Sequence, residues 1–166
     1  MDGKRDMKYA QNVEELLSSK QLSEMTGLEF IQGIRDGKYP APPISETLNY
    51  NLLEAEFGKV TFFGKPSFAA MNPIGTVHGG WFGTLLDSCM ACAVQTQLGK
   101  GFGYTTLEYK INIIRPLYAN SEAILAKGEA THVGRKTGIA TGRMIGAETG
   151  KVYATGSTTC LIFPIE

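Results

Sequence analysis

The order of apolar patterns along the chain predicts an α+β fold in which one curved antiparallel sheet encloses a single helix. Two segments of strand-like alternation come first, then a run of about 18 to 20 residues without proline that is apolar on nearly all sides, then four more strand-like segments. A helix that is apolar all round must be wrapped by protein. We expect the strands that precede and follow the helix in the sequence to form the sheet that encloses it.

Each predicted element has its own pattern. The segments "LNYNLLEAEFG" and "KVTFFGKP" predict two strands joined by a turn at residues 57–59. The helix is expected within "HGGWFGTLLDSCMACAVQTQLGKG", closed by Gly99. The remaining strands are expected in "YTTLEYKINII", "SEAILAKGEATHVG", "TGIATGRMIGA" and "KVYATGSTTCLIF", the last two joined by a tight turn at residues 148–150.

We interpret residues 1–45 as a helical N-terminal extension with a proline-rich linker, and residues 46–166 as the main domain. Apolar residues at helical spacing predict helical segments in residues 8–20 and in "LSEMTGLEFIQGIRDGK", the second capped by Ser23 or Thr26. The prolines of "YPAPPIS" should interrupt any helix and form an extended link. The extension is expected to lie on the domain rather than to join its sheet.

The composition excludes several classes. Acidic and basic residues balance at 16 each, so no overall field favours nucleic acid or an anionic membrane. The N-terminus lacks the apolar run of a signal peptide and no run could span a membrane, so a cytoplasmic protein is expected. Because there are only two histidines and no cluster of acidic residues, we do not expect a metal site. Cys89 and Cys92 have redox-like spacing but fall mid-helix, so we expect them to be core residues.

The stretch "NPIGTVHGGWFGTLLDS" carries the chemistry. Gly79 and Gly80 at the start of a helix let a ligand approach the backbone without a Cβ in the way. The first N–H groups of a helix have no partner within it and lie at the positive end of its dipole, so they could stabilise an oxyanion. A tight turn into the helix that needs small residues is the competing explanation.

Asp87 shifts the balance toward function. It lies in "TLLDSCMACA", where the helix should be buried, and a buried carboxylate needs a partner or a task. No Lys or Arg lies three or four residues away to form an ion pair. A hydroxyl, from Ser88 or from a facing strand, could hold it structurally. Otherwise it could be a nucleophile or general base whose pKa is raised by desolvation.

The spacing between the two features predicts a dimer. Eight residues separate Asp87 from Gly79, or about 12 Å along a helix. One carbonyl group cannot contact both from the same helix, because a base must lie within about 3 Å of the atoms it serves. The simplest second source is the same helix of a partner related by a two-fold axis. We therefore expect a homodimer with two composite sites.

These residues resemble a known family. Asn72, His78 and Asp87 fall at the spacings of the PaaI-like, hotdog-fold acyl-CoA thioesterases, which have an Asn six residues before the His of HGG and an Asp nine residues after it. "TTLEYKINIIRP" and "HVGRKTG" are similar to two further segments of that family. The resemblance covers about residues 46–163 and implies a hotdog fold, acting as a homodimer or a dimer of dimers (a homotetramer).

The resemblance also implies roles. The Gly79 amide would polarise the thioester carbonyl, and Asp87 of the partner would act as nucleophile or as base for water. Asn72 would position water or carbonyl. His78 would shape the loop and hold Asn72. A strand hydroxyl, here that of Thr106 with Thr105 beside it, would complete the catalytic group.

For substrate binding, Arg135 and Lys136 match the place where the family can hold the phosphates of coenzyme A, although a plain hairpin turn explains "GRKTG" equally well. Gly80 would let the coenzyme A thioester approach the backbone. No cofactor and no metal is expected, because coenzyme A is part of the substrate.

The expected function is hydrolysis of acyl-CoA thioesters. The alternatives are a protein that binds or senses acyl-CoA without cleaving it, a hotdog hydratase that pairs a His with an Asp, and a protein with only an assembly role. A buried Asp87 argues against simple binding, and the separation of His78 from Asp87 argues against a hydratase. The acyl group cannot be read from the sequence.

Overall fold

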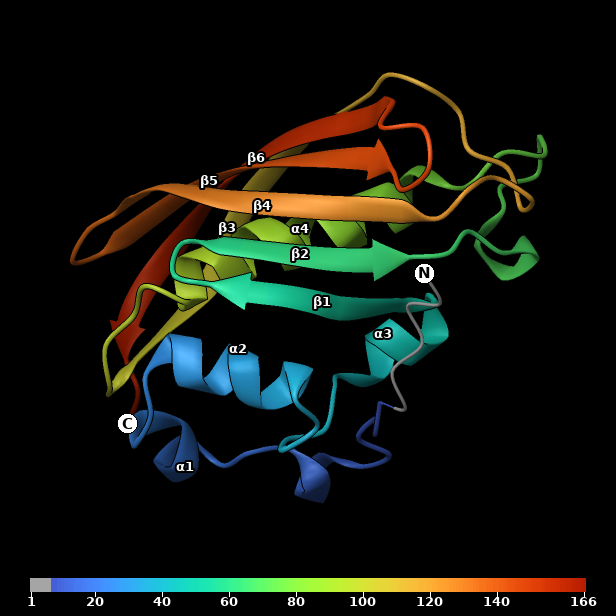
Figure 1. Ribbon diagram of the computed structural model, residues 1–166. Coiled ribbons are helices and arrows are strands. Elements are labelled where there is room, and N and C mark those ends of the chain that lie inside the picture. The colour runs from blue at the N-terminus through green and yellow to red at the C-terminus, as the bar shows by residue number, and fades with distance from the viewer. Residues whose placement is uncertain (1–6) are drawn as a thin grey trace.

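The computed structural model describes residues 7–166 and shows a six-stranded antiparallel sheet curved around one long helix, α4 (Gly79–Gln95) (Figure 1). The strand order in the sheet is β1-β2-β4-β5-β6-β3. This architecture confirms the predicted α+β hotdog fold. The strands are β1 (Tyr50–Glu56), β2 (Lys59–Gly64), β3 (Phe102–Ile113), β4 (Ile124–Val133), β5 (Thr137–Gly146) and β6 (Val152–Pro164).

The predicted turns lie where the strands reverse. Gly58, with φ of 76°, joins β1 to β2, and Gly150, with φ of 66°, lies between β5 and β6. Both residues occupy the left-handed region that glycine enters without steric cost. These two pairs of strands are therefore joined without a long connection, whereas β3 and β4 follow longer connections.

The helix α4 lies unusually close to the sheet at β4. A Cβ on Gly128 would lie 2.1 Å from the carbonyl oxygen of Cys89. Only glycine permits this approach, since any side chain would displace the helix backbone. Leu85, Leu86 and Met90 of α4 are fully buried. The helix ends at Gln95, four residues before the expected stop at Gly99.

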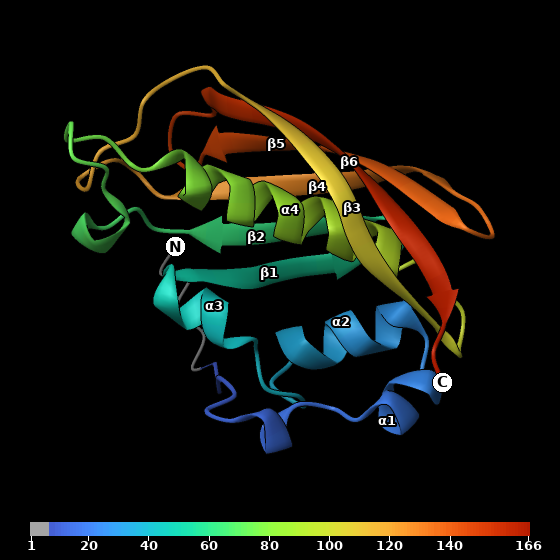
Figure 2. The same cartoon turned by 180° about the vertical axis from the view of Figure 1, so that it is seen from behind.

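The curved sheet leaves one side of α4 open, between its two edge strands β1 and β3. From behind, β3 is seen crossing α4, and β1 runs below the helix in this view (Figure 2). Residues near the N-terminus cover the β1 edge, where helix α2 (Gly27–Arg35) packs on the strand. No strand of residues 7–166 pairs with the outer edge of β3.

The N-terminal residues form a layer of short helices, in agreement with the predicted helical extension. Besides α2 it contains the 3-10 turn η1 (Val13–Glu15), α1 (Ser19–Ser23) and α3 (Pro43–Thr47), and a second 3-10 turn η2 (Phe68–Ala70) follows β2. None of the helices among residues 7–166 is long and apolar enough to cross a membrane.

Two expectations for this layer were wrong. Residues 8–20 form only η1 and the start of α1, because Val13 is 77% exposed and Leu16 is 45% exposed. Without a buried apolar face, a short helix has little to stabilise it. The proline-rich segment is not wholly extended, since Pro43 begins α3. Proline is favoured at the first helical position, where its missing N–H costs nothing.

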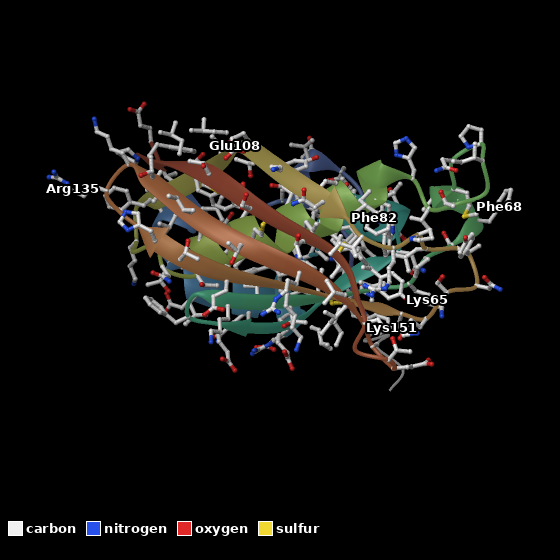
Figure 3. The ribbon with its side chains drawn as sticks, turned by 90° about the horizontal axis from the view of Figure 1, so that it is seen from above. Lys65, Phe68, Phe82, Glu108, Arg135 and Lys151 are labelled. Atoms are coloured by element: carbon white, nitrogen blue, oxygen red, sulfur yellow. The ribbon has the colours of Figure 1, made fainter. Side chains whose placement is uncertain are left out.

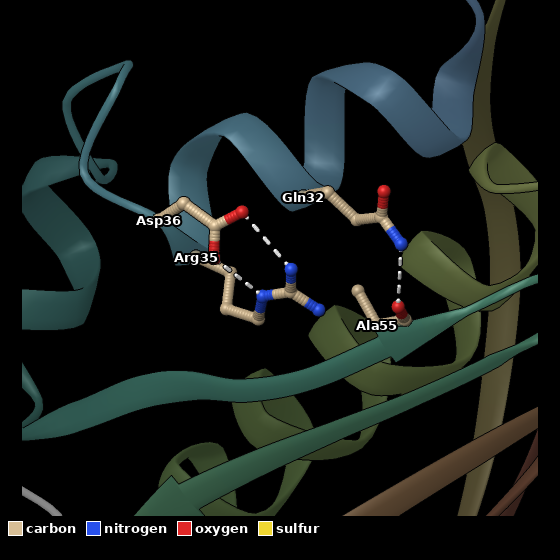
Figure 4. A network of polar contacts seen from close by, with 4 residues as sticks. All are labelled: Gln32, Arg35, Asp36 and Ala55. Carbon is tan, nitrogen blue, oxygen red and sulfur yellow. Dashed lines mark hydrogen bonds and ion pairs between the residues drawn. The ribbon is translucent and has the colours of Figure 1, made fainter.

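Helix α2 contacts the domain at two points, its first residue and Gln32. Thr26 caps it through a reciprocal capping box with Glu29, which confirms one of the two predicted caps. A Cβ on Gly27 would lie 1.7 Å from the carbonyl oxygen of Gln95, so α2 begins in direct contact with the end of α4. Further along, the Gln32 amide donates a 3.1 Å hydrogen bond to the carbonyl oxygen of Ala55 in β1 (Figure 4).

Candidate active site

Asp87 and Thr106 form the centre of the candidate site. Asp87 lies in the middle of α4, and Thr106 comes from the edge strand β3. The Thr106 hydroxyl donates a 2.9 Å hydrogen bond to Oδ1 of Asp87. The structure thus brings together two residues that the sequence motif singled out, and a facing-strand hydroxyl holds the carboxylate.

Asp87 is half-buried rather than enclosed. Burial raises the pKa of the Asp87 carboxyl above its ordinary value, and the hydrogen bond from Thr106 opposes that rise. The direction agrees with the expectation from the sequence. A carboxylate that is partly desolvated binds a proton more readily, which suits a base, while its exposed part remains open to a substrate.

A second polar contact joins α4 to the other edge strand, β1. Tyr50 at the start of β1 and Ser88 of α4 have their hydroxyl oxygens 3.1 Å apart. Burial raises the pKa of the Tyr50 phenol. The two edge strands thus each contact one of two adjacent residues of α4, Asp87 and Ser88. Ser88 was among the predicted partners of Asp87, whereas Tyr50 was not predicted, because no local motif marks a contact between residues 38 positions apart.

The start of α4 presents one free amide. His78 is the N-cap residue, and its Nδ1 accepts a 2.8 Å hydrogen bond from the Gly80 N–H. The amide of Gly79 has no acceptor among residues 7–166. The N–H of Gly79, at the start of α4, is therefore free to donate a hydrogen bond to a ligand, as the oxyanion hypothesis requires. Gly80 can offer a ligand only close approach, because its own N–H is already used.

Asn72 organises the loop ahead of the helix. Its side chain donates a 2.7 Å hydrogen bond to the Thr76 hydroxyl and accepts from the amides of Ile74 and Thr76. No hydrogen bond joins it to His78 within the described chain, so the expected support of Asn72 by His78 is replaced by contacts inside the loop. His78 is instead fixed through its own amide, which donates to Ala70 at 2.8 Å.

Arg135 and Lys136 lie far from the start of α4. They occupy the turn between β4 and β5, at the end of the molecule opposite the Phe82 end of the helix (Figure 3). Both are exposed and line an open groove of about 560 Å³. The groove also contains the exposed aromatic residues Phe102 and Phe163.

The cysteines do not form a redox pair. Cys89, Cys92 and Cys160 are free thiols. Burial raises the pKa of the Cys92 thiol to about 12, and that of Cys89 is raised further still. Thiols with such high pKa values are poor nucleophiles. Among residues 7–166, no group of three His, Cys, Asp or Glu side chains could hold a metal ion.

Comparisons with known proteins agree with this geometry. A family model described as "Thioesterase superfamily" matches residues 74–153, which contain Asp87, Thr106 and the start of α4. No curated protein gives a significant match.

Several solved structures are similar. A phenylacetic acid degradation-related protein from Ralstonia eutropha JMP134 is 25% identical, with a TM-score of 0.71, covering 80% of this chain and 98% of that one. A thioesterase family protein from Silicibacter pomeroyi is 24% identical, with a TM-score of 0.67, covering 74% and 90%. The E. coli PaaI protein from the phenylacetic acid degradation operon is 19% identical, with a TM-score of 0.66, covering 73% and 84%.

The last two likenesses show the fold alone, the hotdog. The family match and the Ralstonia neighbour support a PaaI-like hotdog thioesterase, so the resemblance drawn from the sequence motif is confirmed. These findings support thioester hydrolysis as the general activity and a small-molecule thioester as the class of substrate.

Proposed function

We propose that the protein hydrolyses acyl-CoA thioesters at two sites shared across a homodimer. In each site Asp87 of one subunit activates water, or attacks directly, while the amide of the partner's Gly79 stabilises the oxyanion. The observation that carries the proposal is the half-buried Asp87, which is held by Thr106 and whose pKa is raised by burial. A carboxylate in that position has no ion-pair partner among residues 7–166 and no capping duty.

In the water route, Asp87 accepts a proton from water as the oxygen attacks the carbonyl carbon. The carbonyl oxygen gains negative charge and is stabilised by a backbone N–H. Collapse of the tetrahedral intermediate breaks the C–S bond, and the thiolate of coenzyme A leaves and takes up a proton. In the covalent route, Asp87 attacks the carbonyl carbon, the C–S bond breaks as the coenzyme A thiolate leaves and is protonated, and water then hydrolyses the resulting anhydride to the free acid and the Asp87 carboxylate. Thr106 keeps the carboxylate oriented in both.

The need for two subunits follows from distance. Gly79 and Asp87 are eight residues apart on one straight helix, about 12 Å along its axis. The open edge of β3 supports a second copy as the source of the missing amide. Unpaired strand edges readily pair with another chain. Exposed apolar side chains lie along and just beyond this strand, at Leu107, Tyr109, Ile113 and Ile114.

A two-fold axis at this edge would place one β3 antiparallel to the other. The partner subunit would then lie against α4 and bring its Gly79 amide toward Asp87. By the family resemblance, two such dimers would associate into a tetramer.

The groove at Arg135 and Lys136 supports coenzyme A binding. Two cations suit the phosphates of coenzyme A, and the rings of Phe102 and Phe163 offer apolar surface to its adenine. The two cations lie beside the β3 and β6 ends of the sheet, so the coenzyme would extend along that edge.

Thiol release from a panel of acyl-CoAs tests the activity. The wild-type protein should release coenzyme A from some members, and Asp87→Asn should reduce kcat by about a thousandfold while keeping its fold. The control is Glu129→Gln, which removes an exposed carboxylate that pairs with Lys59. Full turnover by folded Asp87→Asn would refute the role of Asp87. Tight binding of acyl-CoA without thiol release would establish the non-catalytic alternative.

Mixing inactive subunits tests the sharing. An Asp87→Ala chain and a Gly79→Pro chain, the latter lacking the proposed N–H donor, should each be inactive alone. A mixed dimer holds one intact site, so random mixing should restore about a quarter of the wild-type activity per subunit. A mixture that stays inactive, although mass spectrometry detects mixed dimers, would count against a shared site.

A further inference from the structure

A small apolar cavity lies between the N-terminal layer and the domain. Its volume is about 60 Å³. Helix α2 contributes Ile31 and Ile34, and the domain contributes Tyr50, Phe62 and Cys92 among the other lining residues. The family match begins at residue 74, so the α2 side of this cavity is built by a part of the chain outside the matched segment.

Two lining residues, Tyr50 and Cys92, connect the wall of the cavity to the candidate site. Tyr50 lines the cavity and its hydroxyl contacts Ser88, the neighbour of Asp87. Cys92, also in the lining, is one helical turn beyond Ser88 on the same side of α4. An acyl group with its carbonyl at Asp87 would therefore pass Ser88 and meet Cys92 before it enters the cavity.

The acyl group and coenzyme A would then leave the carbonyl in different directions. The cavity lies on the β1 side of α4, whereas the groove that holds Arg135 and Lys136 lies beside β3 and β6. A thioester bound at Asp87 between the two edge strands fits this division, with the tail toward one edge and the coenzyme toward the other.

The dimensions indicate how long the acyl chain is. Five residues separate Asp87 from Cys92, about 7.5 Å along the helix. An extended chain advances about 3.3–3.6 Å for every three bonds, so about six bonds span that distance. A cavity of about 60 Å³ then holds a few more carbons at most. It is too small for an aromatic ring, since benzene occupies an engineered cavity of about 150 Å³.

Resting on the proposed function, we propose that the cavity is the end of the acyl-binding site and that Ile31 and Ile34 of α2 set its length. The substrates are aliphatic acyl-CoAs of medium chain length, about eight to ten carbons. The N-terminal layer is the element that selects them, because it closes the acyl site from the outside. Hydrolysis itself requires nothing from α2.

Chain-length profiles test this inference. Acetyl-, butanoyl-, hexanoyl-, octanoyl-, dodecanoyl- and phenylacetyl-CoA are assayed with wild type, Ile34→Phe and Ile34→Ala. Ile34→Phe fills the cavity and should lower kcat/KM for octanoyl-CoA by at least about tenfold, mainly through KM, while acetyl-CoA changes by less than about twofold. Ile34→Ala enlarges the cavity and should move the optimum toward dodecanoyl- or phenylacetyl-CoA. Ile31→Ala should enlarge the cavity in the same way, at a lining residue that is itself buried.

The matched control is the pair Ile44→Phe and Ile44→Ala. Ile44 belongs to the same layer but is 47% exposed and does not line the cavity. Its variants should keep the wild-type profile. Equal loss for all chain lengths in Ile34→Phe, or unchanged profiles in both Ile34 variants, would overturn the inference while leaving thioester hydrolysis intact. A wild-type protein that hydrolyses no member of the panel would overturn the proposed function, and the inference with it.

Discussion

The hydroxyl of Thr106 lies 2.9 Å from Oδ1 of Asp87, and this bond ties the middle of the buried helix to the edge strand β3. It orients the carboxylate and also limits its pKa, which burial raises. Removing the hydroxyl should therefore change both the rate and its dependence on pH.

For Thr106→Val, we expect kcat/KM to fall by about 10- to 100-fold, since a hydrogen bond to a charged group contributes about 1.5–3 kcal/mol. The pKa of Asp87 rises further without its donor, so the acidic limb of the pH–rate profile moves to higher pH. Thr131→Val, which removes an exposed hydroxyl bonded to Ile139 on another strand, is the control. A lower rate with an unmoved acidic limb would contradict this account.

Asp87 is expected to cost the protein stability when ionised. Its pKa is raised by folding, so its favourable contribution is complete below the unfolded-state pKa of about 3.9 and is lost as the pH rises through the folded-state value. Asp87→Asn should therefore melt at a higher temperature than wild type at pH 7. The difference should shrink toward pH 3. Thermal unfolding across this range measures it, and a variant less stable at pH 7 would disprove the desolvation argument.

Glu122 has the opposite behaviour. Its carboxylate accepts hydrogen bonds from the Glu148 and Thr149 amides, the Thr149 hydroxyl and the Tyr153 hydroxyl, and these hold its pKa at about 2. A depressed pKa stabilises the fold above the unfolded-state value, and that stability is lost as the pH falls through about 2.

For Glu122→Gln we expect a lower free energy of unfolding at pH 7, with a difference from wild type that vanishes near pH 2. Urea titrations at several pH values provide the measurement. Glu129→Gln, in which only an exposed ion pair with Lys59 is lost, should change little. A loss of stability independent of pH would show that shape rather than charge matters at Glu122.

Gly27 should control the attachment of the N-terminal layer. Alanine there would place a Cβ 1.7 Å from the Gln95 carbonyl oxygen, so α2 must move away from α4. Cys92, which lies under this layer in the cavity, should then react faster with a thiol reagent at pH 8. Gly99→Ala is the control, because nothing lies within 4 Å of its added Cβ. Equal labelling rates in the two variants would argue that α2 is held by other contacts.

Patterns of local sequence accounted for most of the domain. The apolar run of α4 and the alternation of six strands follow from periodicities that burial imposes directly, so these elements lie close to their expected positions. The HGG motif likewise located the start of the helix. The turns at Gly58 and Gly150 were found because their backbone conformation favours one residue type.

The misread parts depend on tertiary contacts. Residues 8–20 have helical spacing, but no surface is available to bury their apolar side chains. Pro43 was read as a breaker when it starts a helix. The contact of Tyr50 with Ser88 joins two elements through the curvature of the sheet, which no local pattern encodes. The direction of the His78 side chain, toward Gly80 rather than Asn72, is likewise a matter of loop geometry.

The close seating of α4 on Gly128 has a consequence for how this scaffold could diversify. A helix whose backbone contacts a strand cannot slide or tilt to suit a new substrate, so the position of the Asp87 carboxylate stays the same. Changes in substrate preference must therefore come from residues around the helix. Exchanging the segment before residue 48 for another cap is therefore the economical route to redesigning substrate preference, with the reactive centre left as it stands.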